Sequence, residues 1–143
     1  MMEEYAVNTV GPLMVVKAFH TLLKKAADNQ SDTEISCNKA AIINVSSLAG
    51  SISATINIGM YPYRASKAAL NMVTKCLSMD LKADGIFCAA IHPGWIKTDM
   101  GTDKAPLTIE QGGKIVINAL EQLKGEEMTG VLYSAPKLEV ISF

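Results

Sequence analysis

The sequence predicts an α/β protein in which a parallel sheet carries helices on both faces. Three observations favour this class. Segments with helical periodicity alternate with short apolar runs, in the order helix, strand, helix, strand, helix, strand. The short runs are rich in β-branched and small residues, which is typical of strands buried on both faces. The chain of 143 residues is 49% hydrophobic and 19% charged, so it can bury a core and extensive disorder is not expected.

The first predicted helix covers residues 3–27 and continues through Gly11 and Pro12. Its apolar residues cover more than one helical face; they are Val10, Leu13, Met14, Val16, Ala18, Leu22 and Leu23. Polar residues at 28–39 indicate a loop. The run AAIINVSS at 40–47 predicts a buried strand that ends in two serines.

The second predicted helix runs from about 62 to 82, with Pro62 near its start, where the missing amide hydrogen costs least. Turn-forming residues at 48–60 precede it. Gly85 closes the connection to the next buried strand, IFCAAIHPG, which Pro93 and Gly94 end sharply.

Residues 95–106 are predicted to form a loop, followed by a third helix from Thr108 to Leu123. Thr108 and Gln111 have the spacing of a capping box. GVLYS at 130–134 predicts a last short strand. The whole chain, 1–143, is thus interpreted as a single domain.

Composition narrows the function classes. The net charge is −1 with scattered basic residues, so no nucleic-acid or polybasic membrane surface is expected. The apolar runs are judged too short to span a bilayer, and the N-terminus is acidic, unlike a signal peptide. Three irregularly spaced cysteines indicate reduced thiols and a cytoplasmic protein. Two histidines without a CxxC or HExxH motif predict no metal site.

Polar residues gather where two predicted strands end. Ser46 and Ser47 follow the first strand, and His92, Pro93 and Gly94 follow the second. The carboxyl ends of parallel strands meet at one edge of the sheet, so a site is expected there.

Tyr63 and Lys67 are one helical turn apart at the start of the second helix, directly after the loop that leaves Ser47. A free phenol has a pKa of about 10, and a nearby ammonium favours the phenolate, which suits acid-base chemistry. The alternative is an exposed helical pair without a chemical role. The motif also occurs at Tyr133 and Lys137, but the proline between them makes a helix improbable.

Four ordered motifs resemble the short-chain dehydrogenase/reductase family. YAVNTVGPL resembles the family's helix with an active-site asparagine, and AIINVSSLAG its strand with an active-site serine. YPYRASKAAL resembles the Tyr-x-x-x-Lys helix, and IHPGWIKTDM the Pro-Gly segment over the nicotinamide. The long separation between Ser47 and Tyr63 resembles the carbonyl-reductase branch related to sniffer and C-factor proteins.

The resemblance implies a Rossmann-like fold and an NAD(P)H-dependent carbonyl reductase. Tyr63 would be the acid/base, Ser47 would orient a small carbonyl substrate, Lys67 would hold the nicotinamide ribose, and Asn8 would support a water chain. The cofactor would be NADP, with NAD as the alternative. The residues expected to contact it are Tyr63, Lys67, Pro93, Gly94 and Thr98. Asn8 could instead satisfy backbone groups, Ser47 could cap a turn, and Thr98 could be a polar loop residue.

The family pattern begins with a strand and a glycine-rich turn that receives the cofactor pyrophosphate. The ten glycines of this chain include no Gly-x-Gly pair. The sequence is therefore interpreted as the catalytic, C-terminal part of a doubly wound domain, weakly active or inactive by itself and with weak expected affinity for NADPH. The strand at 40–46 would lack a neighbour and is expected to expose an apolar edge. The alternative is a non-catalytic interaction protein, a homo- or heterodimer partner of full-length relatives through the helices near 3–27 and 61–82.

Overall fold

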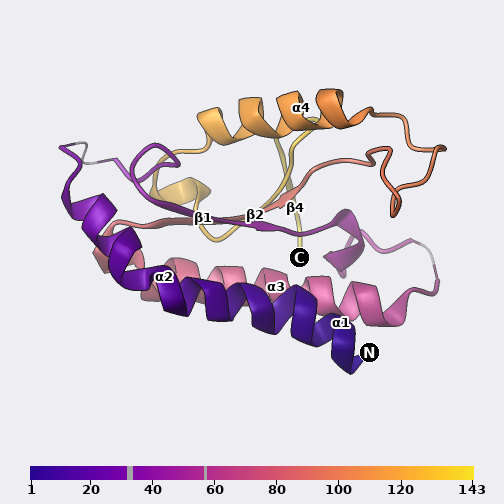
Figure 1. Ribbon diagram of the computed structural model, residues 1–143, viewed down its shortest axis with the longest axis horizontal. Helices are drawn as coiled ribbons and strands as arrows, with labels where there is room; N and C mark the ends of the chain where they lie inside the picture. Colours follow the sequence, from indigo (N-terminus) through magenta and orange to yellow (C-terminus); the bar gives the residue numbers. More distant parts are fainter. Residues whose placement is uncertain (32–33, 57) are drawn as a thin grey trace.

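The computed structural model of the chain describes residues 1–31, 34–56 and 58–143. A four-stranded sheet forms the middle layer (Figure 1). Helix α4 (Ile109–Gln122) covers one face, and α2 (Gly11–Asp28) and α3 (Tyr61–Asp80) cover the other. The predicted α/β class with helices on both faces is thus confirmed. The loops expected at 28–39 and 48–60 include residues 32–33 and 57, which lie outside the described residues.

The N-terminal helix is continuous from Met2 to Asp28 but is not uniform. A short α1 (Met2–Tyr5) leads into a π-helical turn, η1 (Ala6–Val10), before α2 begins. Pro12 lacks the N–H that would bond to the carbonyl of Asn8, which explains why the turn widens there. The sequence predicted the helix but not the π-helical turn that holds Asn8.

Three strands are parallel and in the expected order. These are β1 (Ala41–Val45), β2 (Phe87–His92) and β3 (Leu132–Ser134), with β1 paired to β2 and β2 to β3. The first five residues of β2 are fully buried, as predicted. Helix α3 begins at Tyr61 with Pro62 in its first turn, and Thr108 forms the predicted capping box with Gln111 at the start of α4.

The prediction that residues 130–134 form the last strand is wrong. A further strand, β4 (Glu139–Ile141), folds back antiparallel on β3 and makes the sheet mixed. Leu138 takes a positive φ of 52° in the connecting turn after Pro136. A three-residue strand gives almost no periodicity, so its pairing is decided by contact with β3.

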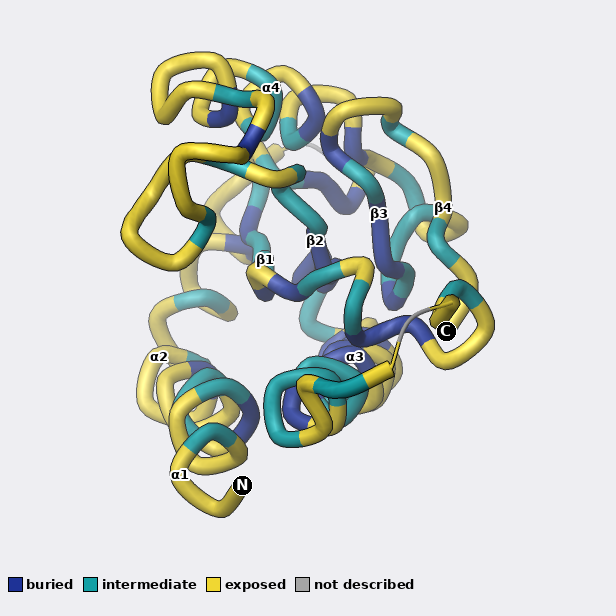
Figure 2. Tube along the Cα trace, turned by 90° about the vertical axis from the view of Figure 1, so that its right-hand side faces the viewer, coloured by how far each residue is buried: buried dark blue, intermediate teal, exposed yellow. Residues whose placement is uncertain are grey.

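The strand at 40–47 was predicted to be buried on both faces, which is wrong for β1, whereas the exposed edge expected for this strand is confirmed. In the sheet order β1-β2-β3-β4, β1 is an edge strand and its residues alternate between buried and partly exposed. Figure 2 shows this edge and α2, which lies further from the sheet centre than β1 does. The other edge, β4, is joined to the rest of the fold by a bond from Ser51 to the Ser142 carbonyl.

The estimate that the apolar runs are too short to cross a membrane needs correction. Among the described residues, the helix Met2–Asp28 is 27 residues long and has a mean hydropathy of 1.2 in its most apolar window. By length and composition alone it could cross a membrane. The core helix of a soluble protein passes the same test, but such a helix is mostly buried, and only 11% of this window is. Here Asp84 binds both His20 and Lys24 of α2 at 2.7 Å, which fixes the helix to the domain. The absence of a membrane role stays a prediction.

Candidate active site at the carboxyl edge of the sheet

The register of the sheet brings the two predicted polar segments to one edge. Val45 of β1 is paired with Ile91 of β2, so Ser47 and Pro93 each follow that pair by two residues. Because the strands are parallel, both segments leave the sheet at its carboxyl end. The long loops between β1 and α3 and between β2 and α4 start from this edge (Figure 1).

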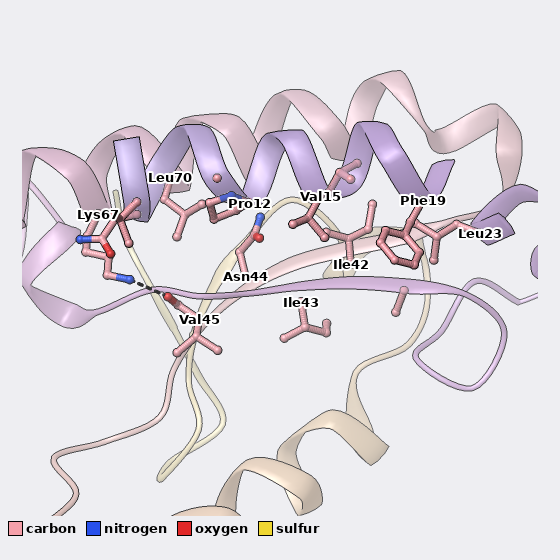
Figure 3. Close-up of a pocket in the computed structure, with 15 residues that line it drawn as sticks. Pro12, Val15, Phe19, Leu23, Ile42, Ile43, Asn44, Val45, Lys67 and Leu70 are labelled. Atoms are coloured by element: carbon pink, nitrogen blue, oxygen red, sulfur yellow. Dashed lines mark hydrogen bonds between the residues drawn. The ribbon is translucent and has the colours of Figure 1, made fainter. Parts of the chain in front are cut away.

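Tyr63 and Lys67 meet at the start of α3. The Lys67 Nζ lies 5.8 Å from the centre of the Tyr63 ring, within the range of a cation–π contact. Lys67 also donates a 2.8 Å bond to the Val45 carbonyl at the end of β1 (Figure 3). Burial lowers the pKa of the Lys67 ammonium, because a partly desolvated cation is disfavoured. The two side chains therefore share one face of the helix, as their spacing predicted.

Asn8 reaches the same helix through Ser66. Its Nδ2 donates to Ser66 Oγ at 3.0 Å, and Ser66 Oγ donates to the Tyr63 carbonyl at 2.8 Å. The neighbouring Thr9 is buried and donates to the Ser66 carbonyl at 2.9 Å. The π-helical turn η1 is thus fixed to the first turn of α3. Ser66 makes this connection, and the sequence analysis missed it.

Ser47 ends β1 and caps the short helix η2 (Leu48–Gly50), since its Oγ accepts from the Ala49 N–H at 3.1 Å. This is the capping alternative raised for Ser47, and it leaves the hydroxyl hydrogen available to a ligand. Gly50 brings η2 against α3: a Cβ there would lie 2.8 Å from the carbonyl carbon and Cβ of Lys67. Only glycine allows the serine turn to approach the lysine this closely.

Two buried hydrogen-bond pairs connect β1 to α3 below the candidate site. Ser46 Oγ donates to Asn71 Oδ1 at 2.6 Å, and Asn44 Nδ2 donates to Thr74 Oγ1 at 2.8 Å. All four residues are buried, so each polar group needs its partner. Of these, the sequence analysis singled out only Ser46. A signal was available, because Asn71 and Thr74 lie at helical spacing from Leu70 and Leu77 and share the buried face of α3 with them.

The neighbouring loop carries Pro93, Gly94 and Thr98, which lie apart from the pair formed by Tyr63 and Lys67. Gly94 has a φ of 93°, and a Cβ there would come within 3.0 Å of Leu107 and Pro136. Thr98 Oγ1 accepts from the Gly101 N–H at 3.0 Å, and Trp95 Nε1 donates to the Gly101 carbonyl at 2.7 Å. These contacts fold the loop on itself next to the strand end that carries Ser47.

His92 is a feature that the sequence analysis named only as part of the strand end. Its Nδ1 is buried and has no hydrogen-bond partner among the described residues. Burial lowers the pKa of the His92 ring, because the imidazolium would be poorly solvated. The ring is therefore neutral near pH 7.

Residues 1–31, 34–56 and 58–143 contain no group of three or more histidine, cysteine or acidic side chains that could hold a metal ion.

A groove of about 640 Å³ lies between α2 and β1, and Lys67 is one of the residues that line it. Figure 3 shows Val15 and Phe19 of α2 directed toward Ile42 of β1, with Lys67 at one end of the groove.

The chain belongs to the short chain dehydrogenase family, whose sequence profile matches residues 1–108. The family assignment made from the four motifs is thereby confirmed.

Particular relatives agree with the carbonyl-reductase branch. The C-signal protein of Myxococcus xanthus is 32% identical over 126 residues, covering 88% of this chain and 69% of that protein. The carbonyl reductase Sniffer of Drosophila melanogaster is 40% identical with a TM-score of 0.96 over 100% of this chain. A carbonyl reductase from chicken fatty liver, solved with NADPH bound, is 40% identical with a TM-score of 0.89. The chain spans 57% and 56% of these two solved chains, respectively.

Proposed function

We propose that this chain carries the catalytic half of an NADPH-dependent carbonyl reductase. The observation that carries the proposal is the position of the Lys67 ammonium 5.8 Å from the Tyr63 ring centre, at the carboxyl edge of the sheet. The solved chicken relative binds NADPH, which favours NADP over NAD here. Family membership supports an oxidoreductase, and the pairing of a phenol with an ammonium supports the short-chain type of chemistry.

The residues fit the nicotinamide end of such a cofactor. Lys67 has three N–H donors, and the Val45 carbonyl takes one, which leaves two for ribose hydroxyls. The Tyr63 hydroxyl has no hydrogen bond to any described residue, so it is available to a ligand. Pro93, Gly94 and Thr98 would form the other side of the nicotinamide site, and their loop starts from the adjacent strand.

When bound, NADPH supplies the hydride that adds to a substrate carbonyl carbon. Tyr63 gives its phenolic proton to the carbonyl oxygen, which becomes the alcohol hydroxyl. Ser47 donates a hydrogen bond to the same oxygen and stabilises its developing negative charge. Asn8 holds the first turn of α3 through Ser66 and, with Lys67, supports the water that returns a proton to Tyr63.

A substitution at Tyr63 tests this proposal. Tyr63→Phe removes the proton donor without changing the ring, so carbonyl-dependent NADPH oxidation should fall by about 10²- to 10⁴-fold. Tyr61→Phe is the matched control, because Tyr61 is 72% exposed on the same helix and should keep full activity. Equal activity of Tyr63→Phe and wild type would contradict the proposal.

If the wild-type chain alone turns over too slowly to measure, the cofactor site can be tested separately. NADPH titration followed by NMR should shift the amide signals of Gly94 and Lys67. Lys67→Met should abolish the shifts, whereas Lys75→Met, an exposed position further along α3, should not. Identical shifts in both variants would place the cofactor elsewhere.

The second candidate function is a docking protein without turnover. It is favoured by exposed apolar side chains on both long helices, such as Met14 at 54% and Met72 at 64%. In this case Met14→Glu and Met72→Glu should weaken association with a full-length relative in sedimentation equilibrium, while Tyr63→Phe should not.

A further inference from the structure

We propose that Arg64 is a positioning residue of the candidate site. Its guanidinium holds the connection between β1 and α3, and thereby sets where the Ser47 hydroxyl lies relative to the Tyr63 phenol. We call residues 48–55, which follow Ser47, the serine segment. The catalytic consequence rests on the function proposed above, whereas the positioning itself can be measured without turnover.

Arg64 bonds to three points of this connection. Its Nε donates to the Gly59 carbonyl at 3.0 Å. Its Nη1 donates to the Ala49 carbonyl and to the Thr55 hydroxyl, both at 3.5 Å. The two longer contacts are individually weak, but a guanidinium is planar and rigid, so its N–H groups fix the three acceptors relative to one another.

The half-buried Arg64 makes these bonds in place of an ion pair. It is the single arginine of the chain, and none of the ion pairs among residues 1–31, 34–56 and 58–143 includes it. A partly buried charge needs hydrogen bonds to offset its lost hydration. Here two backbone carbonyls and a hydroxyl provide them. The contacts that stabilise the guanidinium are therefore the same contacts that hold the connection between β1 and α3.

The residues bound by Arg64 lead directly to Ser47. The Ala49 N–H donates to Ser47 Oγ at 3.1 Å, so the residue whose carbonyl Arg64 binds also orients the serine hydroxyl. Thr55 Oγ1 accepts from Arg64 and donates to the Ser51 carbonyl at 2.6 Å, which a hydroxyl with one hydrogen and two lone pairs permits. A displacement of the guanidinium would therefore reach the serine hydroxyl through the serine segment.

Two other contacts fix the serine segment, and each acts at one point. Asn71 Nδ2 donates to the Gly50 carbonyl at 3.2 Å, about two turns further along α3 than Arg64. Ser51 Oγ donates to the Ser142 carbonyl, which joins the segment to the chain after β4. Neither contact involves the residues directly before α3. Among the described residues, Arg64 is the one side chain that bonds to both ends of the connection.

The turn that leads into α3 is strained and gains support from Arg64. Gly59 and Met60 have consecutive positive φ values of 86° and 55°, and the second is costly for a residue with a side chain. Arg64 stabilises this turn twice, through its Nε bond to the Gly59 carbonyl and through a 2.9 Å bond from its backbone N–H to the Met60 carbonyl. Because Tyr63 follows the turn by three residues, the position of the phenol depends on the turn.

Hydrogen exchange of the 143-residue chain tests the positioning. Arg64→Met removes the N–H donors and keeps an unbranched apolar side chain. The amides of Ala49 and Ala54, which both bond to serine hydroxyls, should then exchange at least about tenfold faster, because the segment opens more easily. The Leu70 amide inside α3 should not change. Lys75→Met, which removes a cation from an exposed position of α3, should affect none of these amides. Wild-type exchange in a folded Arg64→Met would show that the side chain only fills space and would overturn the proposal.

Kinetics separate this proposal from the proposed function. In carbonyl-dependent NADPH oxidation, Arg64→Met should lower kcat by about 10- to 100-fold, because Ser47 is misplaced. It should leave KM for NADPH within about twofold, because Lys67 is intact. Full kcat in Arg64→Met, in an assay where Tyr63→Phe is inactive, overturns the positioning role and leaves the proposed function standing. Where wild type and Tyr63→Phe are equally active or equally inactive, hydrogen exchange alone decides the positioning.

Arg64→Lys is the second variant. It keeps the charge, but an ammonium has no rigid fork to hold the three acceptors together. We expect exchange at Ala49 between the rates of wild type and Arg64→Met. Wild-type exchange in Arg64→Lys would show that a positive charge suffices and would overturn the proposal. If Arg64→Met does not fold, Arg64→Lys replaces it in both measurements.

Discussion

At the scale of single residues, the carboxyl end of β2 carries a histidine whose environment opposes its charge. The His92 Nδ1 is buried, and an added proton there would find no acceptor among the described residues. Its pKa lies below the ordinary value of 6.5 because of burial. Protonation of this ring therefore acts directly on the stability of the folded state.

His92 predicts a loss of stability in mild acid. As pH falls below 6.5, the unfolded chain binds a proton that the folded chain resists, so the free energy of unfolding decreases until the folded pKa is passed. The thermal midpoint should drop between about pH 7.5 and about pH 5.5. His92→Phe should remove most of this drop, and His20→Gln should keep it. An equal drop in His92→Phe and wild type would contradict the assignment.

At the scale of elements, the candidate site depends on how closely η2 approaches α3. Ser47 and Lys67 come from different elements, and Gly50 sets the distance between them because a Cβ would collide with the Lys67 backbone. The buried pairs Ser46–Asn71 and Asn44–Thr74 align β1 with the same helix. The packing of η2 against α3 therefore sets the distance between Ser47 and Lys67.

Gly50→Ala tests this dependence. The new methyl group would push η2 away from α3, which should lower the free energy of unfolding by about 1–3 kcal/mol, as overpacking does. Gly113→Ala is the control, since a Cβ there meets nothing within 4 Å and the position lies inside α4. It should raise stability by about 0.5–1 kcal/mol. Denaturant unfolding of both variants provides the measurement, and an unchanged Gly50→Ala would show that η2 is free to move.

At the scale of the whole molecule, the sheet has one edge joined to the rest of the fold and one edge open. β4 and the Ser51–Ser142 contact complete one side, whereas β1 and α2 leave the groove at the other. The site proposed above would hold only the nicotinamide end of a dinucleotide, and the ten glycines include no Gly-x-Gly pair for its pyrophosphate.

The isolated 143-residue chain should therefore bind NADPH weakly. We expect a dissociation constant above about 1 μM in isothermal titration, corresponding to less than about 8 kcal/mol of binding free energy. A submicromolar constant for the chain alone would show that other residues hold the pyrophosphate.

Much of this architecture was predictable because local signals agree with it. Pro62 and the Thr108–Gln111 capping box mark helix starts correctly, and the buried run of β2 reads directly from its apolar residues. β4 was missed because three residues give no usable period. The π-helical turn at Asn8 was missed because Pro12 affects a carbonyl four residues earlier, while the pattern of apolar side chains stays helical.

The sequence by itself determined the family, the order of the first six helices and strands, and the one-turn spacing of Tyr63 and Lys67, since these depend on residues close together in the chain. Only the tertiary structure decided which groups meet across long separations. Asn8 reaches α3 through Ser66, which lies 58 positions later, and β4 pairs with β3 although its three residues give no usable period. The physical reason is that neighbours along the chain set local conformation, while burial and hydrogen-bond partners depend on packing between distant elements.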